Sequence, residues 1–325
     1  MKIINAGQRE CRCGSICGTL DVDKRLNYIV FALNTTRQLL IFFGIAYAFA
    51  WAVAAWMILA HIRVEFVIVA SWGPALAALA TNRVASGNYR AFRFNVNWPR
   101  TFGATALGVF LVIASVIVFP AVVVADAGKL NWSALFALGN YNYSTLLGGP
   151  LTEEPGWRGF ALPRLQSRFH PVVASVILGT LWAAWHLPFF LYPGWSQCPV
   201  VTYFLVLIAL SILMTFVTNL ARFGVIAPIA MHAVFNTSGR YFQGLFSQTN
   251  PGDGGLLNNL FHLIPMAERW RPYIHISIFT SLAIGAWSAA ILLIAFTKGR
   301  LGYSSALGLS FSRGNIVDNK EHEAS

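Results

Sequence analysis

The strongest constraint on this chain is a series of continuous apolar blocks, most of them about 20 residues long. An α-helix of about 20 residues crosses a hydrocarbon core roughly 30 Å thick. A β-barrel would instead show segments of about ten residues in which apolar and polar positions alternate. Because only helices and closed barrels satisfy every backbone polar group in lipid, we expect an all-α fold, a polytopic transmembrane helical bundle.

The composition agrees with this class of protein. Hydrophobic residues make up 56% of the 325 positions and charged residues only 11%, against roughly 25% charged residues in a soluble domain. This shortage of charge excludes an ordinary soluble fold and a disordered chain. The net charge of +11 does not indicate a nucleic-acid partner, because Lys and Arg collect in the cytoplasmic loops of membrane proteins.

About eight spans with both termini in the cytoplasm are the simplest solution. The predicted spans cover residues 39–60, 66–80, 102–124, 144–162, 171–192, 200–220, 225–237 and 273–296. The loop over 81–101 contains arginines and no acidic residue, which places it in the cytoplasm. We expect three parts: a polar leader over 1–36, a single transmembrane domain over 37–300 and a polar tail over 301–325.

Ionisable residues inside the predicted spans are few, and they cluster on three helices. They are Glu153, Glu154 and Arg158 in the fourth span, His186 in the fifth, and His232 with Asn236 in the seventh. Each such residue costs on the order of 2.5 to 3.5 kcal/mol on insertion scales, which favours a functional role. We therefore expect these groups to converge on a polar cavity between the central helices.

Helical spacing predicts which of the charged groups pair with each other. Glu154 and Arg158 are four residues apart and share a helix face, so they can pair and offset the cost of burial. Glu153 points about 100° away and has no such partner. A free carboxylate can act as a general base toward water, and an imidazole can hold that water. His232 and Asn236, again four apart, supply donors suited to an oxyanion.

These parts indicate a hydrolase that attacks an amide directly with water. The sequence contains no GxSxG motif, and Cys198 lies in a predicted turn outside the spans that carry the two histidines. A metal site is the alternative: Glu153, His186 and His232 are of ligand types common at zinc, although HExxH is absent. The residues leave a zinc-dependent and a metal-free glutamate mechanism equally open.

The polar residues of the fourth, fifth and seventh predicted spans also resemble the motifs of the CPBP or Abi family of intramembrane endopeptidases. This family includes the CAAX prenyl proteases and bacteriocin-processing enzymes. The EExxxR motif corresponds to Glu153, Glu154 and Arg158. Trp182 with His186 matches the aromatic-and-histidine motif, and His232 with Asn236 matches HxxxN. The resemblance covers about residues 144–240.

The resemblance implies proteolysis near the C-terminus of a membrane-associated protein or peptide, with prenylation of the substrate left open. It assigns water activation to Glu153 and His186, the oxyanion site to His232 and Asn236, and support to Glu154 and Arg158. Pro155 directly follows the paired carboxylates, which predicts a kink or a helix start there.

Two other classes of protein remain as alternatives. A transporter or proton-coupled carrier could use the same polar core as a relay, and a non-catalytic immunity or scaffold protein could keep these residues for structure. In each case we expect an integral membrane protein with lipid as a partner, and we expect a bacterial cell membrane. The sequence does not define an oligomeric state.

Overall fold

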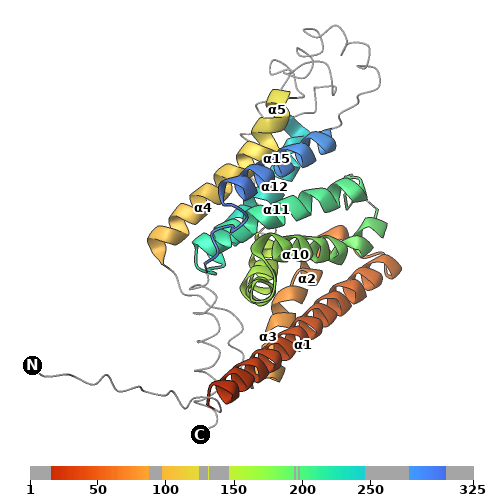
Figure 1. Cartoon of the computed structure of the whole chain (residues 1–325). Helices are drawn as coiled ribbons and strands as arrows, with labels where there is room; N and C mark the ends of the chain where they lie inside the picture. The colour runs from red at the N-terminus through yellow and green to blue at the C-terminus, as the bar shows by residue number, and fades with distance from the viewer. Residues whose placement is uncertain are drawn as a thin grey trace, which may run out of the picture.

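Figure 1 shows the computed structural model, which describes residues 16–87, 97–123, 131, 146–193, 195–196, 198–245 and 278–304. Every regular element within these ranges is helical, which confirms the predicted all-α class. The α-helices are α1 (Ile16–Leu59), α2 (Val67–Ala70), α3 (Gly73–Ser86), α4 (Trp98–Val112), α5 (Phe119–Val123), α8 (Pro150–Glu154), α9 (Leu162–Gln166), α10 (Pro171–Trp185), α11 (Val200–Leu220), α12 (Ile226–Leu245) and α15 (Ile278–Phe296).

The remaining helical pieces are of other types. Two are π-helices, η2 (Ile113–Val118) between α4 and α5, and η5 (Pro155–Ala161) between α8 and α9. Two are 3-10 helices, η1 (Val64–Phe66) before α2 and η6 (Leu187–Leu191) after α10. The third and fourth predicted spans are therefore each interrupted by a π-helical segment.

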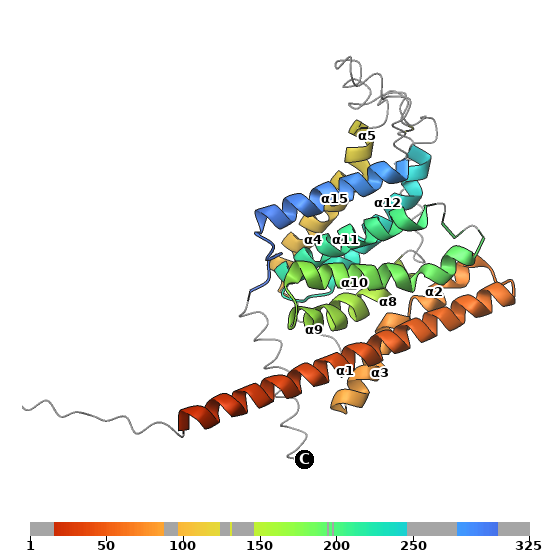
Figure 2. The ribbon, with the colours of Figure 1, turned by 45° about the vertical axis from the view of Figure 1, so that its right-hand side comes forward.

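The helices pack in a simple order from one side of the bundle to the other. The long α1 packs on α3, while α10 packs on α11 and α11 on α15, with α4 against α12. Figures 1 and 2 agree that α1 borders one side, that α4 and α15 border the other, and that α10 lies between them. The short α8 contacts both α3 and α12, so it lies inside the bundle.

Proline and capping residues explain where several of these helices begin. Pro74, Pro99, Pro150 and Pro171 occupy the first or second position of α3, α4, α8 and α10. A proline is favoured there because its missing N–H would have no partner within the helix. At the start of α4, the Asn97 side-chain oxygen accepts a hydrogen bond from the Arg100 backbone N–H at 3.3 Å.

Six helical stretches in the described part of the chain are long and apolar enough to cross a membrane. They are Asn34–Leu59, Val64–Ser86, Trp98–Val122, Pro171–Leu191, Val200–Leu220 and Phe279–Phe296. The two other predicted spans, 144–162 and 225–237, also form helices but do not reach this standard, because they carry the polar motifs. The count of eight and the cytoplasmic termini stay predictions.

Several predicted boundaries differ from the structure. The helix expected from residue 144 begins at Pro150 and continues through α9 to Gln166. The predicted polar leader over 1–36 overlaps α1, which already begins at Ile16, because its polar residues are compatible with a helix. The predicted span over 225–237 corresponds to α12, which continues to Leu245. Residues 246–277 lie outside the described residues, as do 1–15 and 305–325.

Small and hydroxyl-bearing residues bring α10 and α11 close together. A side chain added at Gly179 would place its Cβ 2.8 Å from Ile208 Cα, so glycine is required for this approach. Nearby, the Ser175 hydroxyl donates to Thr215 Oγ1 at 2.8 Å, and the Ser211 hydroxyl donates to the Ser175 carbonyl at 2.9 Å. This contact fixes the face of α10 that carries the aromatic-and-histidine motif.

Candidate active site

The paired carboxylates lie at the end of α8, directly before a change of helix type. Glu153 and Glu154 close the five-residue α8, and Pro155 opens the π-helix η5. Proline has no N–H to offer the carbonyl of Leu151, so a regular α-helix cannot continue here. The predicted disturbance at Pro155 is therefore present, and it leaves the two adjacent side chains in different surroundings.

Glu154 is buried in a three-residue cluster. Its Oε1 atom accepts hydrogen bonds from Arg158 Nη1 at 3.1 Å and from His232 Nδ1 at 2.8 Å. Both Glu154 and Arg158 have no exposed side-chain surface. The predicted pair four residues apart is present, and the same carboxylate also ties α8 to His232 on α12. Glu154 is not among the residues that line the cavity described below, which fits the predicted supporting role.

Trp182 on α10 connects the remaining charged groups. Its indole N–H donates to Glu153 Oε2 at 2.7 Å, and the Arg158 guanidinium lies 4.3 Å from the centre of its ring. The same ring meets His232 edge to face, with 5.1 Å between centroids. Trp182 is 1% exposed. One oxygen of Glu153 is thus fixed by a donor, while Oε1 remains available.

The orientation of His186 follows from its backbone partner. Nδ1 lies 2.8 Å from the carbonyl oxygen of Trp182. A carbonyl can only accept, so Nδ1 carries the proton, and in the neutral ring Nε2 then presents a lone pair. The ring is enclosed by Trp185 at 4.7 Å, Tyr203 at 5.4 Å and Trp195 at 5.8 Å between centroids.

All four predicted catalytic residues line one cavity of about 250 Å³. Glu153, His186, His232 and Asn236 share its wall with Trp182, Trp185, Trp195, Tyr203 and others. A Cβ placed on Gly149 would lie 3.2 Å from Asn236 Nδ2, 3.3 Å from Glu153 Oε1 and 3.7 Å from His232 Cε1. These groups therefore converge on one point, where glycine leaves the space open. The predicted polar cavity between central helices is present.

The three predicted metal ligands, Glu153, His186 and His232, all line this cavity. Among the residues that the structure describes, no group of three or more His, Cys, Asp or Glu side chains is close enough to hold a metal ion. Glu153 Oε2 and the Nδ1 atoms of both histidines already have protein partners. A metal ion held by Glu153, His186 and His232 would use the remaining Glu153 Oε1 and histidine Nε2 atoms, and the metal alternative stays a prediction.

Cys198 lies in the turn before α11 and is not part of this cavity. Burial raises the pKa of its thiol to about 11. The thiolate is the nucleophilic form of cysteine, so a thiol with this pKa is inert at neutral pH. This supports the prediction that no cysteine nucleophile is used.

The structure adds residues that the sequence analysis did not select. Ser71, at the break between α2 and α3, lines the cavity and accepts a hydrogen bond from the Thr152 hydroxyl at 3.0 Å. Tyr203 and Trp195 complete the aromatic wall around His186. No local pattern marks these positions, because they approach the motifs only through the packing of α3 and α11. Trp182 was identified through the resemblance, but its hydrogen bond to Glu153 was not.

Comparisons with known proteins show that this region is similar to one family. Residues 132–238 match the family described as type II CAAX prenyl endopeptidase Rce1-like. This part of the chain, which holds Glu153, His186, His232 and Asn236, is therefore similar to the CAAX protease family, in agreement with the motif resemblance. With its six apolar helices, the chain is an integral membrane protein.

A relative among the curated proteins carries a matching name. The chain is 29% identical over 114 residues to "CAAX prenyl protease 2" of Methanococcus maripaludis. The aligned region covers 30% of this chain and 42% of that protein, so the match spans less than half of the relative's length. It supports the family of the site region and leaves the bacterial origin a prediction.

The contrast between the neighbouring carboxylates gives a stability prediction. We expect Glu154→Gln to lower the free energy of unfolding by about 3 kcal/mol or more, because Arg158 loses its buried counter-charge. Glu153→Gln should change it by about 1 kcal/mol or less, because the amide oxygen still accepts from Trp182. Thermal unfolding of the two purified variants in one detergent measures this difference. Equal losses in both variants would show that the two carboxylates are not divided in this way.

Proposed function

We propose that this protein is an intramembrane endopeptidase that cleaves a peptide bond near the C-terminus of a membrane-associated substrate. The observation that carries the proposal is the convergence of Glu153, His186, His232 and Asn236 on one cavity. The family of the site region supports a peptidase over other hydrolases. The nucleophile is water, activated directly by the side chains of the cavity.

Glu153 and His186 prepare the water in this mechanism. Glu153 Oε1 takes a proton from the water as its oxygen attacks the scissile carbonyl carbon, and His186 Nε2 accepts a hydrogen bond that orients the same water. Breaking of the C–N bond follows, and Glu153 returns the proton to the leaving amine nitrogen. The water thus supplies one oxygen to the new carboxyl group and one proton to the amine. Such a general base contributes about 10²- to 10⁴-fold to the rate.

His232 and Asn236 stabilise the oxyanion of the tetrahedral intermediate. Asn236 Nδ2 is a donor near Glu153 Oε1, as their common approach to Gly149 shows. His232 Nδ1 donates a hydrogen bond to Glu154 Oε1, so the ring donates to the oxyanion through Nε2 when both of its nitrogens carry a proton. The hydrogen bond to Glu154 Oε1 holds the orientation of the ring. Glu154 and Arg158 act as positioning residues.

The walls of the cavity suggest the character of the substrate. Trp185, Phe189, Trp195 and Phe235 give it an apolar lining beside the polar groups, and such a surface suits an apolar side chain or a lipid group. The curated relative's name specifies a prenylated CAAX substrate for that protein. We therefore propose a membrane-associated peptide as substrate here, with a prenylated C-terminal cysteine as the first candidate.

The central experiment measures cleavage by the purified full-length protein in detergent. We expect cleavage of a membrane-associated peptide, tested with and without a prenylated C-terminal cysteine. Glu153→Ala, His186→Ala and His232→Ala should each lower kcat by about 100-fold or more, because each removes a group that acts on the water or the oxyanion.

A matched control separates catalysis from folding. His170→Gln changes an exposed histidine at the start of α10 that does not line the cavity, so it should keep wild-type activity. Folding of each variant is checked by its elution as a single species in gel filtration. Full activity of the Glu153 and His186 variants would rule out the mechanism. Complete absence of cleavage by the wild-type protein would favour the carrier or scaffold alternatives.

The metal requirement has its own test. The mechanism above routes no step through a metal ion, so we expect peptidase activity to survive prolonged incubation with 1,10-phenanthroline. The non-chelating 1,7-isomer serves as the control. Loss of activity with the chelator alone, restored by added zinc, would show that the enzyme is metal-dependent.

A further inference from the structure

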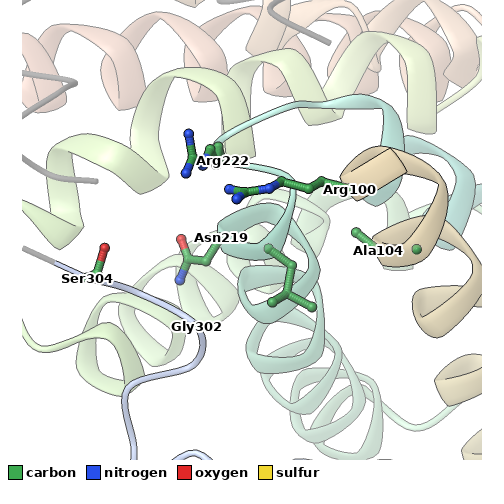
Figure 3. Close-up of a pocket in the computed structure, with 8 residues that line it drawn as sticks. Arg100, Ala104, Asn219, Arg222, Gly302 and Ser304 are labelled. Carbon is green, nitrogen blue, oxygen red and sulfur yellow. The ribbon is translucent and has the colours of Figure 1, made fainter. Parts of the chain in front are cut away.

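A second cavity, of about 400 Å³, lies at the opposite part of the bundle from any catalytic residue that we name. Three chain segments meet there: the start of α4, the end of α11 and the turn that follows α15. Its lining consists of Arg100, Gly103, Ala104, Asn219, Leu220, Arg222, Gly302 and Ser304. Figure 3 shows the guanidinium groups of Arg100 and Arg222 directed into the same space.

Arg100 and Arg222 line the same cavity, and no acidic side chain lines it with them. No acidic residue occurs among the eight lining residues, and the first turn of α4 also contains none. Within the described ranges, neither guanidinium has a side-chain hydrogen bond or an ion pair. Like charges that share a cavity repel each other, and an anion bound between them removes that repulsion.

Asn219 supplies an independent indication of a ligand. Its side chain is 3% exposed, and its Nδ2 donates to the Leu301 carbonyl at 2.8 Å. Its Oδ1 has no partner in the described part of the chain, and in Figure 3 this oxygen points toward the two arginines. A buried acceptor of this kind normally has a hydrogen-bond partner. The cavity therefore offers a ligand two guanidinium groups and one unpaired acceptor.

The turns around the cavity hold these groups in place. Arg222 and Phe223 both adopt left-handed backbone conformations, with φ of 52° and 64°, which non-glycine residues rarely do. The Phe223 ring packs against Tyr303, at 6.4 Å between centroids. This contact and the bond from Asn219 to Leu301 join the end of α11 to the turn after α15. The cavity is therefore built from two connected turns and the start of α4.

The charge distribution around the cavity favours a phosphate as the ligand. The N-terminal end of α4 carries partial positive charge, although the nearby C-terminal end of α11 opposes it. Arginine forks bind phosphate oxygens in a bidentate manner. By the positive-inside rule, Lys298 and Arg300 after α15 predict that this end of the bundle faces the anionic cytoplasmic leaflet.

We propose that the cavity formed by Arg100, Arg222 and Asn219 binds a phosphate group. The two arginines hold its oxygens, and Asn219 Oδ1 accepts from a hydroxyl or ammonium donor next to it. Phospholipid headgroups such as phosphatidylglycerol combine these features. Free inorganic phosphate offers the same charge, and its protonated form offers a hydroxyl.

The test is native mass spectrometry of the full-length protein in detergent, titrated separately with phosphatidylglycerol, phosphatidylcholine and inorganic phosphate. We expect a one-to-one adduct with phosphatidylglycerol or with phosphate, and the arm that forms it identifies the source. The double variant Arg100→Gln/Arg222→Gln should weaken that adduct about tenfold or more, since it removes both charge-assisted contacts.

The matched control removes the same charge from the same region. Lys298→Gln/Arg300→Gln changes two exposed cations outside the cavity lining and should alter binding by less than about twofold. Gel filtration and thermal unfolding confirm that both double variants are folded. Equal weakening in the two double variants, or no adduct in either anionic arm, would overturn the proposal.

Discussion

A single carboxylate oxygen, Glu154 Oε1, holds together the polar centre of this protein. It accepts from Arg158 on η5 and from His232 on α12, in surroundings where an unpaired charge would be very costly. Because the guanidinium and the imidazole both need this partner, α8, η5 and α12 have little freedom relative to one another. The position of the cavity follows from this constraint.

Trp182 orients the neighbouring carboxylate, Glu153, in a similar way. Its indole N–H fixes Glu153, its carbonyl fixes His186, and its ring covers Arg158. Glu153, His186 and His232 are therefore each oriented by a group that does not itself react. Such preorganisation lets a small set of side chains act on one water molecule without rearrangement.

The sequence predicted most of the site and less of the fold. Helical spacing alone gave the pairing of Glu154 with Arg158, and the cost of burying ionisable groups in spans predicted the meeting of Glu153, His186, His232 and Asn236. The π-helix after Pro155 was anticipated only as a disturbance, since the type of turn depends on how η5 packs against α3.

Other features depend on tertiary contacts that no local pattern records. Ser71 and Tyr203 reach the cavity because α3 and α11 pack beside α8 and α10. The number of spans was harder to predict for a related reason: α8 and α12 carry the polar groups of the site, so they lack the continuous apolar character by which a span is recognised. Helices of this kind are stabilised by their neighbours in the bundle rather than by lipid.

The account depends most directly on the protonation of the two histidine rings, which ¹⁵N NMR of histidine-labelled protein in detergent can determine. The signals are assigned by their loss in His186→Gln and His232→Gln. The account predicts a protonated Nδ1 in both rings and, for His186, an unprotonated Nε2 that faces the cavity. A His186 ring protonated on Nε2 with a free Nδ1 would contradict the hydrogen bonding on which the proposed water activation depends.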